Sequence, residues 1–143
     1  NMEQATRKAV RNGWIHTGDL ARVEQNGYFT IVDRISDMII SGAENIYPKE
    51  IEDVISNHPA VMEVAVFGIP DEVWGESVCA AVVAKEAHKV TEQELIDFCA
   101  SKISGYKKPK MVKIMAELPK NPSGKIMKKV LKEPYWAGRS KRV

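Results

Sequence analysis

The chain has 143 residues, of which 44% are hydrophobic and 28% charged, as in an ordinary globular protein of one domain or one domain with an appendage. Its apolar runs are far shorter than the roughly 20 residues that cross a bilayer, and its first residues lack the basic and apolar regions of a signal peptide. We therefore expect neither a membrane span nor a secretory leader. The net charge is +2, but the charges are unevenly distributed along the chain.

That asymmetry separates an acidic part from a basic end. Residues 1–101 carry 8 Lys and Arg against 17 Asp and Glu, whereas residues 102–143 carry 13 against 2. A basic end predicts either a polyanionic partner or only a solvated surface. The end is rich in Lys and poor in aromatic residues, which disfavours nucleic acid and fits a phosphorylated small molecule at least as well.

The first predicted elements are a polar, helix-compatible segment over 1–13 and then a β-hairpin. Apolar runs at 20–24 and 28–32 flank Asn26-Gly27, which is a strong hairpin signal. A short strand follows at 38–40 and ends at Ser41-Gly42.

The middle of the chain predicts a helix followed by two strands. Pro48 suits a first helical turn, and Ile51, Val54 and Ile55 share one face until His58-Pro59 ends the helix. Strands are expected at 61–69 and 77–85, the second with apolar residues on both faces.

A second helix begins after Thr91, which forms a capping-box pattern with Glu94, and it ends at Gly105. A strand at 111–115, a Pro- and Gly-rich turn at 118–126, a short helix at 127–132 and a loose tail from Pro134 complete the prediction. The fold class is therefore α+β, a small mixed β-sheet flanked by helices and preceded by a β-hairpin.

Four positions have a local structural interpretation besides a chemical one. Asp19 after a Thr-Gly turn suits ribose hydroxyls or simply caps the turn, and Arg34 offers a donor fork for phosphate or pairs with Asp37 at the surface. Gly42 permits close approach of a ligand or only forms a turn. Lys125 can serve as a point charge for a phosphate or carboxylate, or lie on an ordinary surface turn.

Three segments carry a joint pattern: Thr17-Gly18-Asp19, the stretch from Asp33 to Glu52, and the stretch from Pro119 to Lys125. Together they resemble the late core motifs of the AMP-forming acyl- and aryl-CoA ligases, the adenylate-forming superfamily that also includes firefly luciferases and the adenylation domains of peptide synthetases. The resemblance covers about residues 12–132, and the long central motif is specific by itself.

The resemblance implies a two-step reaction. A carboxylate attacks the α-phosphate of ATP with Mg²⁺, giving an acyl-adenylate and pyrophosphate, and the thiol of CoA then gives acyl-CoA and AMP. Family members carry a large N-terminal domain and a small mobile C-terminal domain, so this chain resembles a fragment of a longer ligase. We expect residues 1–35 to end the N-terminal domain and approach a hinge, residues 36–133 to form the C-terminal domain, and residues 134–143 to be a loose tail.

The same resemblance assigns roles to residues. Lys125 is expected to be the catalytic Lys of adenylation, where a compact charge stabilises developing negative charge. Asp19 and Arg34 are expected to bind the ribose and phosphates of the nucleotide. The expected CoA-binding residues are Gly42 and Ala43 at the pantetheine tunnel, Trp74 beside the CoA arm, and Tyr106, Lys108 and Lys110 at the adenine and 3′-phosphate.

Three positions depart from the usual pattern. Ser36 stands at the hinge position, where Asp or Lys is common, and Ala43 replaces a common Gly. Glu44 stands where acetyl-CoA synthetases tend to carry Arg, which favours a medium- or long-chain fatty acid or an aromatic acid as the substrate.

Other interpretations keep part of this prediction. A superfamily member with another acceptor, such as a carrier-protein thiol or oxygen, would not need the 3′-phosphate positions Tyr106, Lys108 and Lys110. A non-catalytic binding module would use only the basic end. Cys79 and Cys99 lack metal-ligand spacing and suit free thiols of a reducing compartment, so we expect no metal ligand in this chain and a cytoplasmic location. The three histidines, His16, His58 and His88, do not cluster, and we expect no catalytic role for them.

Overall fold

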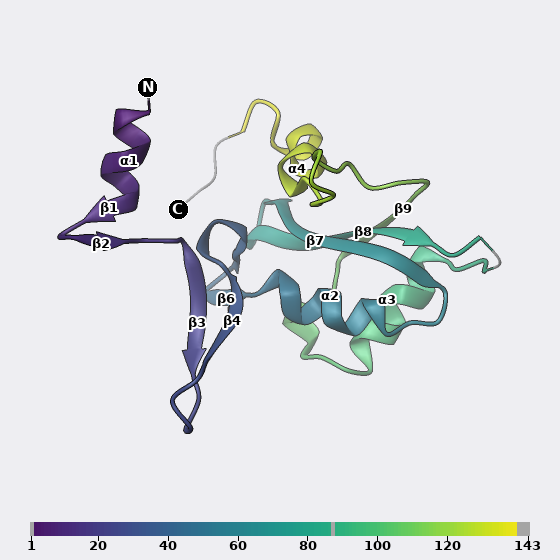
Figure 1. The fold of residues 1–143 in the computed structure, drawn as a ribbon. Coiled ribbons are helices and arrows are strands. Elements are labelled where there is room, and N and C mark those ends of the chain that lie inside the picture. Colours follow the sequence, from purple (N-terminus) through teal and green to yellow (C-terminus); the bar gives the residue numbers. More distant parts are fainter. Residues whose placement is uncertain (1, 87, 140–143) are drawn as a thin grey trace. The chain divides into compact units, whose positions relative to one another are not determined.

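The computed structural model describes residues 2–86 and 88–139, which divide into two compact units, Asn1–Ser36 and Asp37–Val143 (Figure 1). The first unit contains one helix and two antiparallel hairpins. Its elements are α1 (Glu3–Ala9), β1 (Val10–Arg11), β2 (Trp14–Ile15), β3 (Asp19–Val23) and β4 (Phe29–Arg34). A short 3-10 helix, η1 (Ile35–Asp37), follows β4.

The two hairpins of the first unit use different turns. Asn12 and Gly13 between β1 and β2 both have positive φ, 52° and 78°, as a two-residue type I′ turn requires. The predicted β3–β4 hairpin is confirmed, but five residues, 24–28, separate its two strands, and among them Gly27 alone has a positive φ, of 84°. The Gly27 N–H donates to the Glu24 carbonyl over 2.9 Å. The sequence signal was the same in both places, and only the second was predicted as a hairpin.

The second unit is built on one five-stranded sheet with four strands in the order β6-β5-β8-β7, while β9 pairs in parallel with β8. This confirms the predicted α+β class and mixed sheet. Its elements are β5 (Ile39–Ser41), β6 (Glu44–Ile46), α2 (Pro48–Ser56), β7 (Val61–Asp71), β8 (Gly75–Ala84), α3 (Glu92–Ala100), the 3-10 helix η2 (Gly105–Lys107), β9 (Met111–Met115) and α4 (Lys128–Trp136).

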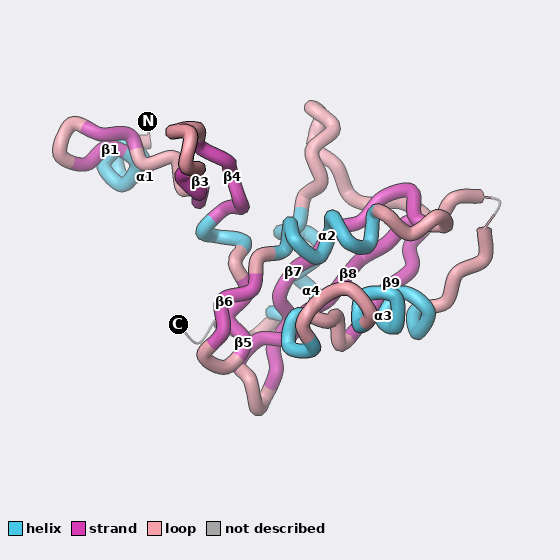
Figure 2. Tube along the Cα trace, turned by 90° about the horizontal axis from the view of Figure 1, so that it is seen from below, coloured by secondary structure: helices cyan, strands magenta, loops and turns pink. Residues whose placement is uncertain are grey.

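Helices cover both faces of this sheet. In Figure 1, α2 and α3 lie on one face and α4 on the other, and Figure 2 shows α2 and α3 along the strands from below. Val78, Ala80 and Val82 of β8 pack with the residues of α2 and α3, whereas the intervening side chains of β8 pack with Leu131 of α4. Because both faces are buried, β8 reads as a continuous apolar run.

Local sequence explains where the main helices begin. Pro48 occupies the first turn of α2, and the Thr91 hydroxyl accepts a hydrogen bond of 3.2 Å from the Glu94 N–H at the start of α3. Both starts are confirmed. Helix α3 ends at Ala100, several residues before the Gly105 expected from the sequence.

Strand β6 is absent from the predicted elements, which pass from the strand ending at Ser41-Gly42 directly to the helix that begins at Pro48. Gly42 has a φ of 65° while Ala43 does not have a positive φ, and Ser41 pairs with Glu44. This is the pattern of a two-residue type II′ turn, which needs glycine at its first central position.

The tail expected from Pro134 to be loose is helical as far as Trp136, beyond the expected helix end at residue 132. The Trp136 indole N–H donates to the Gly68 carbonyl over 3.0 Å, and Tyr135 packs against the core beside Phe67. These anchors hold a last turn that Pro134 alone would disfavour. Residues 140–143 of the predicted tail lie outside the described residues.

One close approach occurs between β7 and β8. The Glu76 side chain is 4% exposed, and a Cβ atom built on Gly68 would lie 2.1 Å from Glu76 Oε2. The absence of a side chain at Gly68 therefore makes the space that the Glu76 carboxylate fills.

Candidate functional site

Asp19 and Arg34 face each other across the β3–β4 hairpin. They are register partners, and Arg34 Nε lies 3.5 Å from Asp19 Oδ1. The Arg34 side chain is 67% exposed, so most of its guanidinium donors face solvent, and Thr17 Oγ1 accepts a hydrogen bond of 3.2 Å from the Asp19 N–H. The hairpin thus brings together a carboxylate that can accept from hydroxyl groups and a fork of donors that suits phosphate oxygens.

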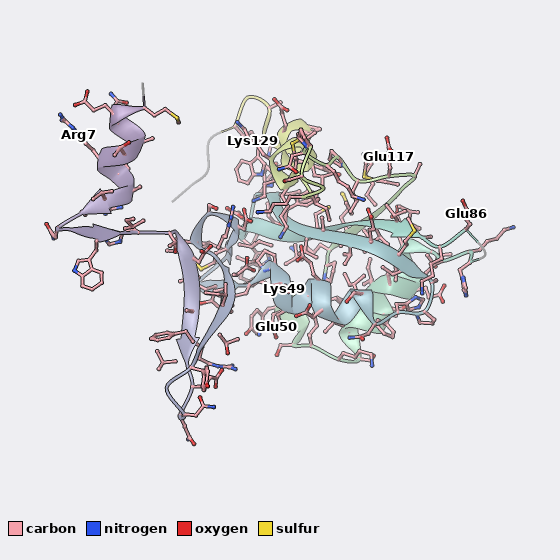
Figure 3. All side chains as sticks on the ribbon, viewed as in Figure 1. Arg7, Lys49, Glu50, Glu86, Glu117 and Lys129 are labelled. Carbon is pink, nitrogen blue, oxygen red and sulfur yellow. The ribbon has the colours of Figure 1, made fainter. Side chains whose placement is uncertain are left out.

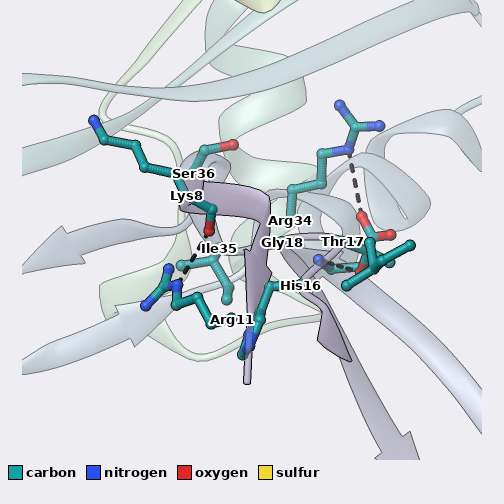
Figure 4. Close-up of a pocket in the computed structure, with 10 residues that line it drawn as sticks. Lys8, Arg11, His16, Thr17, Gly18, Arg34, Ile35 and Ser36 are labelled. Atoms are coloured by element: carbon teal, nitrogen blue, oxygen red, sulfur yellow. Dashed lines mark hydrogen bonds and ion pairs between the residues drawn. The ribbon is translucent and has the colours of Figure 1, made fainter. Parts of the chain in front are cut away.

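The pair lines an open hollow of the first unit, shown in Figure 4. Sequence reasoning found Asp19 and Arg34 but not the basic side chains beside them. The lining residues are Lys8, Arg11, Ile15, His16, Thr17, Gly18, Asp19, Arg34, Ile35 and Ser36. Lys8 and Arg11 come from α1 and β1, which carry none of the recognised motifs, so the only available signal was their positive charge.

Gly42 and Trp74 meet in the second unit. The Gly42 N–H donates to the Trp74 carbonyl oxygen over 2.7 Å, and the half-exposed indole lies beside the Gly42 α-carbon. Ala43 is the other central residue of the same turn. The structure therefore brings together three of the residues that the sequence predicted for the CoA arm.

Asp71 connects the β7–β8 turn, which carries Trp74, to Lys110 in the basic end of the chain. Its Oδ1 accepts from the N–H groups of Val73 and Trp74 at 3.0 and 2.9 Å, and its Oδ2 lies 2.9 Å from Lys110 Nζ. The Lys110 ammonium, followed by the Trp74 N–H, lowers the pKa of Asp71 to about 2. Asp71 was not singled out from the sequence, because a Pro-Asp pair after a strand reads simply as a turn.

Tyr106 and Lys108 lie in and after η2, which an ion pair attaches to α2. Lys107 Nζ lies 2.8 Å from both carboxylate oxygens of Glu50, and this contact raises the pKa of Lys107. Figure 3 shows Glu50 and its neighbour Lys49 on α2. The Tyr106 ring is half exposed, with Lys107 Nζ 5.7 Å from its centroid. An exposed ring of this kind can stack on a planar base.

Lys125 lies on a turn that its own neighbours close. Asn121 Oδ1 accepts from Ser123 N, Ser123 Oγ and Lys125 N at 3.0, 2.8 and 2.9 Å, and Gly124 has a φ of 80°. The Lys125 side chain is exposed, and no hydrogen bond or ion pair within residues 2–86 and 88–139 engages its ammonium group. The turn thus presents a cation that is available to a ligand.

The structure does not gather every predicted residue. Among the described residues, no hydrogen bond or ion pair joins Lys125 to Trp74 or Lys110, and Asp19 and Arg34 belong to the other unit. His58 is buried, accepts a hydrogen bond from the Ala60 N–H at 3.3 Å and contacts the Phe98 ring edge-on. These contacts indicate a role in packing.

Within the described part of the chain, no group of three or more His, Cys, Asp and Glu side chains is placed to hold a metal ion. None of the helices there has the length and apolar character that crossing a membrane requires. Cys79 and Cys99 are buried free thiols, and burial raises the pKa of each to about 11.

Curated relatives match almost all of this chain. It is 50% identical over 137 residues to the long-chain-fatty-acid–CoA ligase FadD13 of Mycobacterium tuberculosis, a match that covers 96% of this chain and 27% of the ligase. It is 50% identical over 133 residues to the 2-succinylbenzoate–CoA ligase of Bacillus mycoides, covering 93% and 27%. The chain therefore spans about a quarter of the length of the curated relatives that it matches.

Solved structures and a family model agree with these relatives. The ATP-bound crystal structure of MatB from Rhodopseudomonas palustris matches with a TM-score of 0.87 at 36% identity, covering 94% of this chain and 27% of that one. The model of the C-terminal domain of AMP-binding enzymes matches residues 50–125, which is more than half of the chain. The chain therefore belongs to the family of AMP-binding enzyme C-terminal domains.

Proposed function

We propose that this chain is the C-terminal part of a longer ATP-dependent ligase that activates a carboxylic acid as an acyl-adenylate and transfers the acyl group to CoA. The observation that carries this proposal is the exposed Lys125, held on a closed turn in a chain that is 50% identical to CoA ligases. A fixed, accessible ammonium suits the stabilisation of negative charge that develops between a carboxylate and an α-phosphate.

The first unit supports a longer protein. None of its described residues is buried, and large apolar side chains are exposed, among them Trp14 at 75%, Ile15 at 74% and Phe29 at 71%. Exposed apolar side chains at this density favour packing against further protein. We propose that residues 1–35 complete a preceding N-terminal domain and that Ser36 is the hinge.

The remaining residues have roles in binding. Asp19 and Arg34 would bind the ribose and phosphates of ATP, which would bring Mg²⁺ with it. Gly42, Ala43 and Trp74 would line the path of the pantetheine arm. The Tyr106 ring would stack on the adenine of CoA, and Lys108 and Lys110 would bind its 3′-phosphate. The products of the proposed reaction are AMP, acyl-CoA and pyrophosphate.

The acid is proposed to be a medium- or long-chain fatty acid or an aromatic acid. This rests on Glu44, and it agrees with the named acids of the relatives, a long-chain fatty acid and 2-succinylbenzoate. A cytoplasmic location is proposed because Cys79 and Cys99 are free thiols, as a reducing compartment maintains them.

The test separates the two half-reactions in the longer protein. Lys125→Ala is expected to abolish pyrophosphate release from ATP and acid but to spare CoA use from supplied acyl-adenylate. Lys129→Ala, which removes an exposed Lys from α4 (labelled in Figure 3), is the matched control and should retain both activities. Equal loss of both half-reactions, or intact adenylation, would refute the assigned role. The isolated chain should show no ligase turnover.

A further inference from the structure

The Lys125 turn is closed by one side chain. Asn121 is the residue whose carboxamide oxygen accepts all three hydrogen bonds from Ser123 and Lys125, and its own N–H donates to the Lys125 carbonyl over 2.9 Å. Both backbone polar groups of Lys125 are therefore bound to a single neighbour. The φ and ψ angles of Lys125, which determine where its side chain starts, depend on Asn121.

Ion pairs fix the turn to the body of the second unit on both sides. Before it, Lys120 pairs with Glu63 of β7. After it, Lys128 Nζ lies 2.8 Å from Glu52 Oε1, and both side chains are less than a fifth exposed. The same Glu52 oxygen accepts from the Val66 N–H of β7 over 2.8 Å. The ends of the turn therefore have a rigid base, and its interior depends on Asn121.

We propose that Asn121 is a positioning residue for adenylation, acting through Lys125 and not touching the substrate. This inference rests on the proposed function. A long Lys side chain can sample many positions, and rate depends steeply on how often a catalytic group occupies the reactive one. The hydrogen bonds from Asn121 restrict the backbone origin of that side chain before ATP and the acid are bound.

Kinetics of the longer ligase test this role. Asn121→Ala should lower the kcat of pyrophosphate release by about 10- to 100-fold, with KM values for ATP and acid changed by less than about twofold, because position and not ground-state binding is lost. CoA use from supplied acyl-adenylate should be unchanged, because Lys125 has no part in that step.

Two variants make the result specific. Asn121→Asp keeps the acceptor oxygen and should recover most of the lost kcat, whereas Ser123→Ala removes only one of the three donors and should remain near the wild-type rate. The unfolding temperature, measured in parallel, should be close to wild type for all three, because the turn lies at the surface.

Three results would overturn the inference: an unchanged adenylation kcat in Asn121→Ala, equal loss of both half-reactions, or an Asp variant no better than Ala. If Lys125→Ala still abolishes adenylation while Asn121→Ala is normal, only the positioning role fails. If Lys125→Ala is itself active in adenylation, the role proposed for Lys125 fails and the inference with it.

Discussion

The N–H of Gly42 donates a hydrogen bond of 2.7 Å to the carbonyl oxygen of Trp74, and a Cβ atom on Gly42 would lie 3.0 Å from Trp74 Cε3. The β5–β6 turn and the β7–β8 turn therefore meet through backbone and ring at a glycine whose φ is 65°. Both the backbone conformation and the ring contact require the absence of a side chain.

Gly42→Ala should accordingly destabilise the chain by about 1 kcal/mol for the left-handed backbone, plus a further loss from displacing the indole. Gly124→Ala is the matched control, because Gly124 has a φ of 80° but nothing within 4 Å of a built Cβ. Urea unfolding of both variants measures the difference. Equal destabilisation by the two substitutions would show that the Trp74 contact has no energetic role.

Asp71 predicts a pH dependence of stability. Its folded pKa of about 2 lies below the ordinary value of 3.8, so its ion pair stabilises the fold above pH 4, and this contribution is lost as the pH falls toward 2. Asp71→Asn retains an acceptor for the Val73 and Trp74 N–H groups but loses the charge. The stability difference between wild type and Asp71→Asn should therefore shrink between pH 4 and pH 2.

A double-mutant cycle tests whether the ion pair with Lys110 is the source of the stability that Asp71 contributes. With Lys110→Ala already present, Asp71→Asn should cost less at neutral pH than it does in the wild-type background. An identical cost in both backgrounds would mean that the Asp71–Lys110 pair, 2.9 Å apart, contributes nothing to the stability.

Lys108 and Lys110 predict discrimination between two forms of the coenzyme. In the longer ligase, Lys108→Ala with Lys110→Ala should raise the KM for CoA but not for dephospho-CoA, which lacks the 3′-phosphate. Lys113→Ala, an exposed Lys on the neighbouring strand β9, is the control and should alter neither. Equal effects on the two coenzymes would remove the 3′-phosphate assignment.

Substitutions of Glu52 should separate the cost in stability of losing its charge from the cost of losing its hydrogen-bond acceptor. Glu52→Ala leaves the buried Val66 N–H without its hydrogen bond and should cost about 1–3 kcal/mol of unfolding free energy. Glu52→Gln keeps an acceptor and should cost less. Asp53→Ala, which breaks an exposed pair with Lys49, should stay within about 0.5 kcal/mol. If urea titrations give Glu52→Gln the same loss of unfolding free energy as Glu52→Ala, the hydrogen bond to the Val66 N–H does not account for the cost.

The strongly patterned elements followed from sequence. Ile51 and Ile55 marked the buried face of α2, Thr91 marked the start of α3, and the long apolar run marked β8. The missed elements depended on short-range turn chemistry or distant contacts. Strand β6 has three residues and forms because Gly42 reverses the chain, and α4 passes Pro134 because Trp136 bonds to Gly68, 68 residues away.

The candidate site divides in the same way. Lys125, Trp74 and Lys110 were found because their motifs resemble those of a known family. Asp71 and Asn121 were not, because each acts through hydrogen bonds to backbone or to a distant side chain, and such partners are brought together only by the fold. The roles of the motif residues in catalysis and binding stay predictions.

Gly68 and Glu76 have a consequence for strand alignment. Strand β8 is apolar on both faces, so sliding it by one residue against β7 would still bury apolar side chains, and hydrophobic pattern alone distinguishes poorly between the two alignments. The Glu76 carboxylate, however, fits only beside a residue with no side chain, and Gly68 is the glycine within β7. A shifted pairing would press that carboxylate against a bulky neighbour. Gly68 thus favours a single register between β7 and β8, the one in which the Glu76 carboxylate lies beside it.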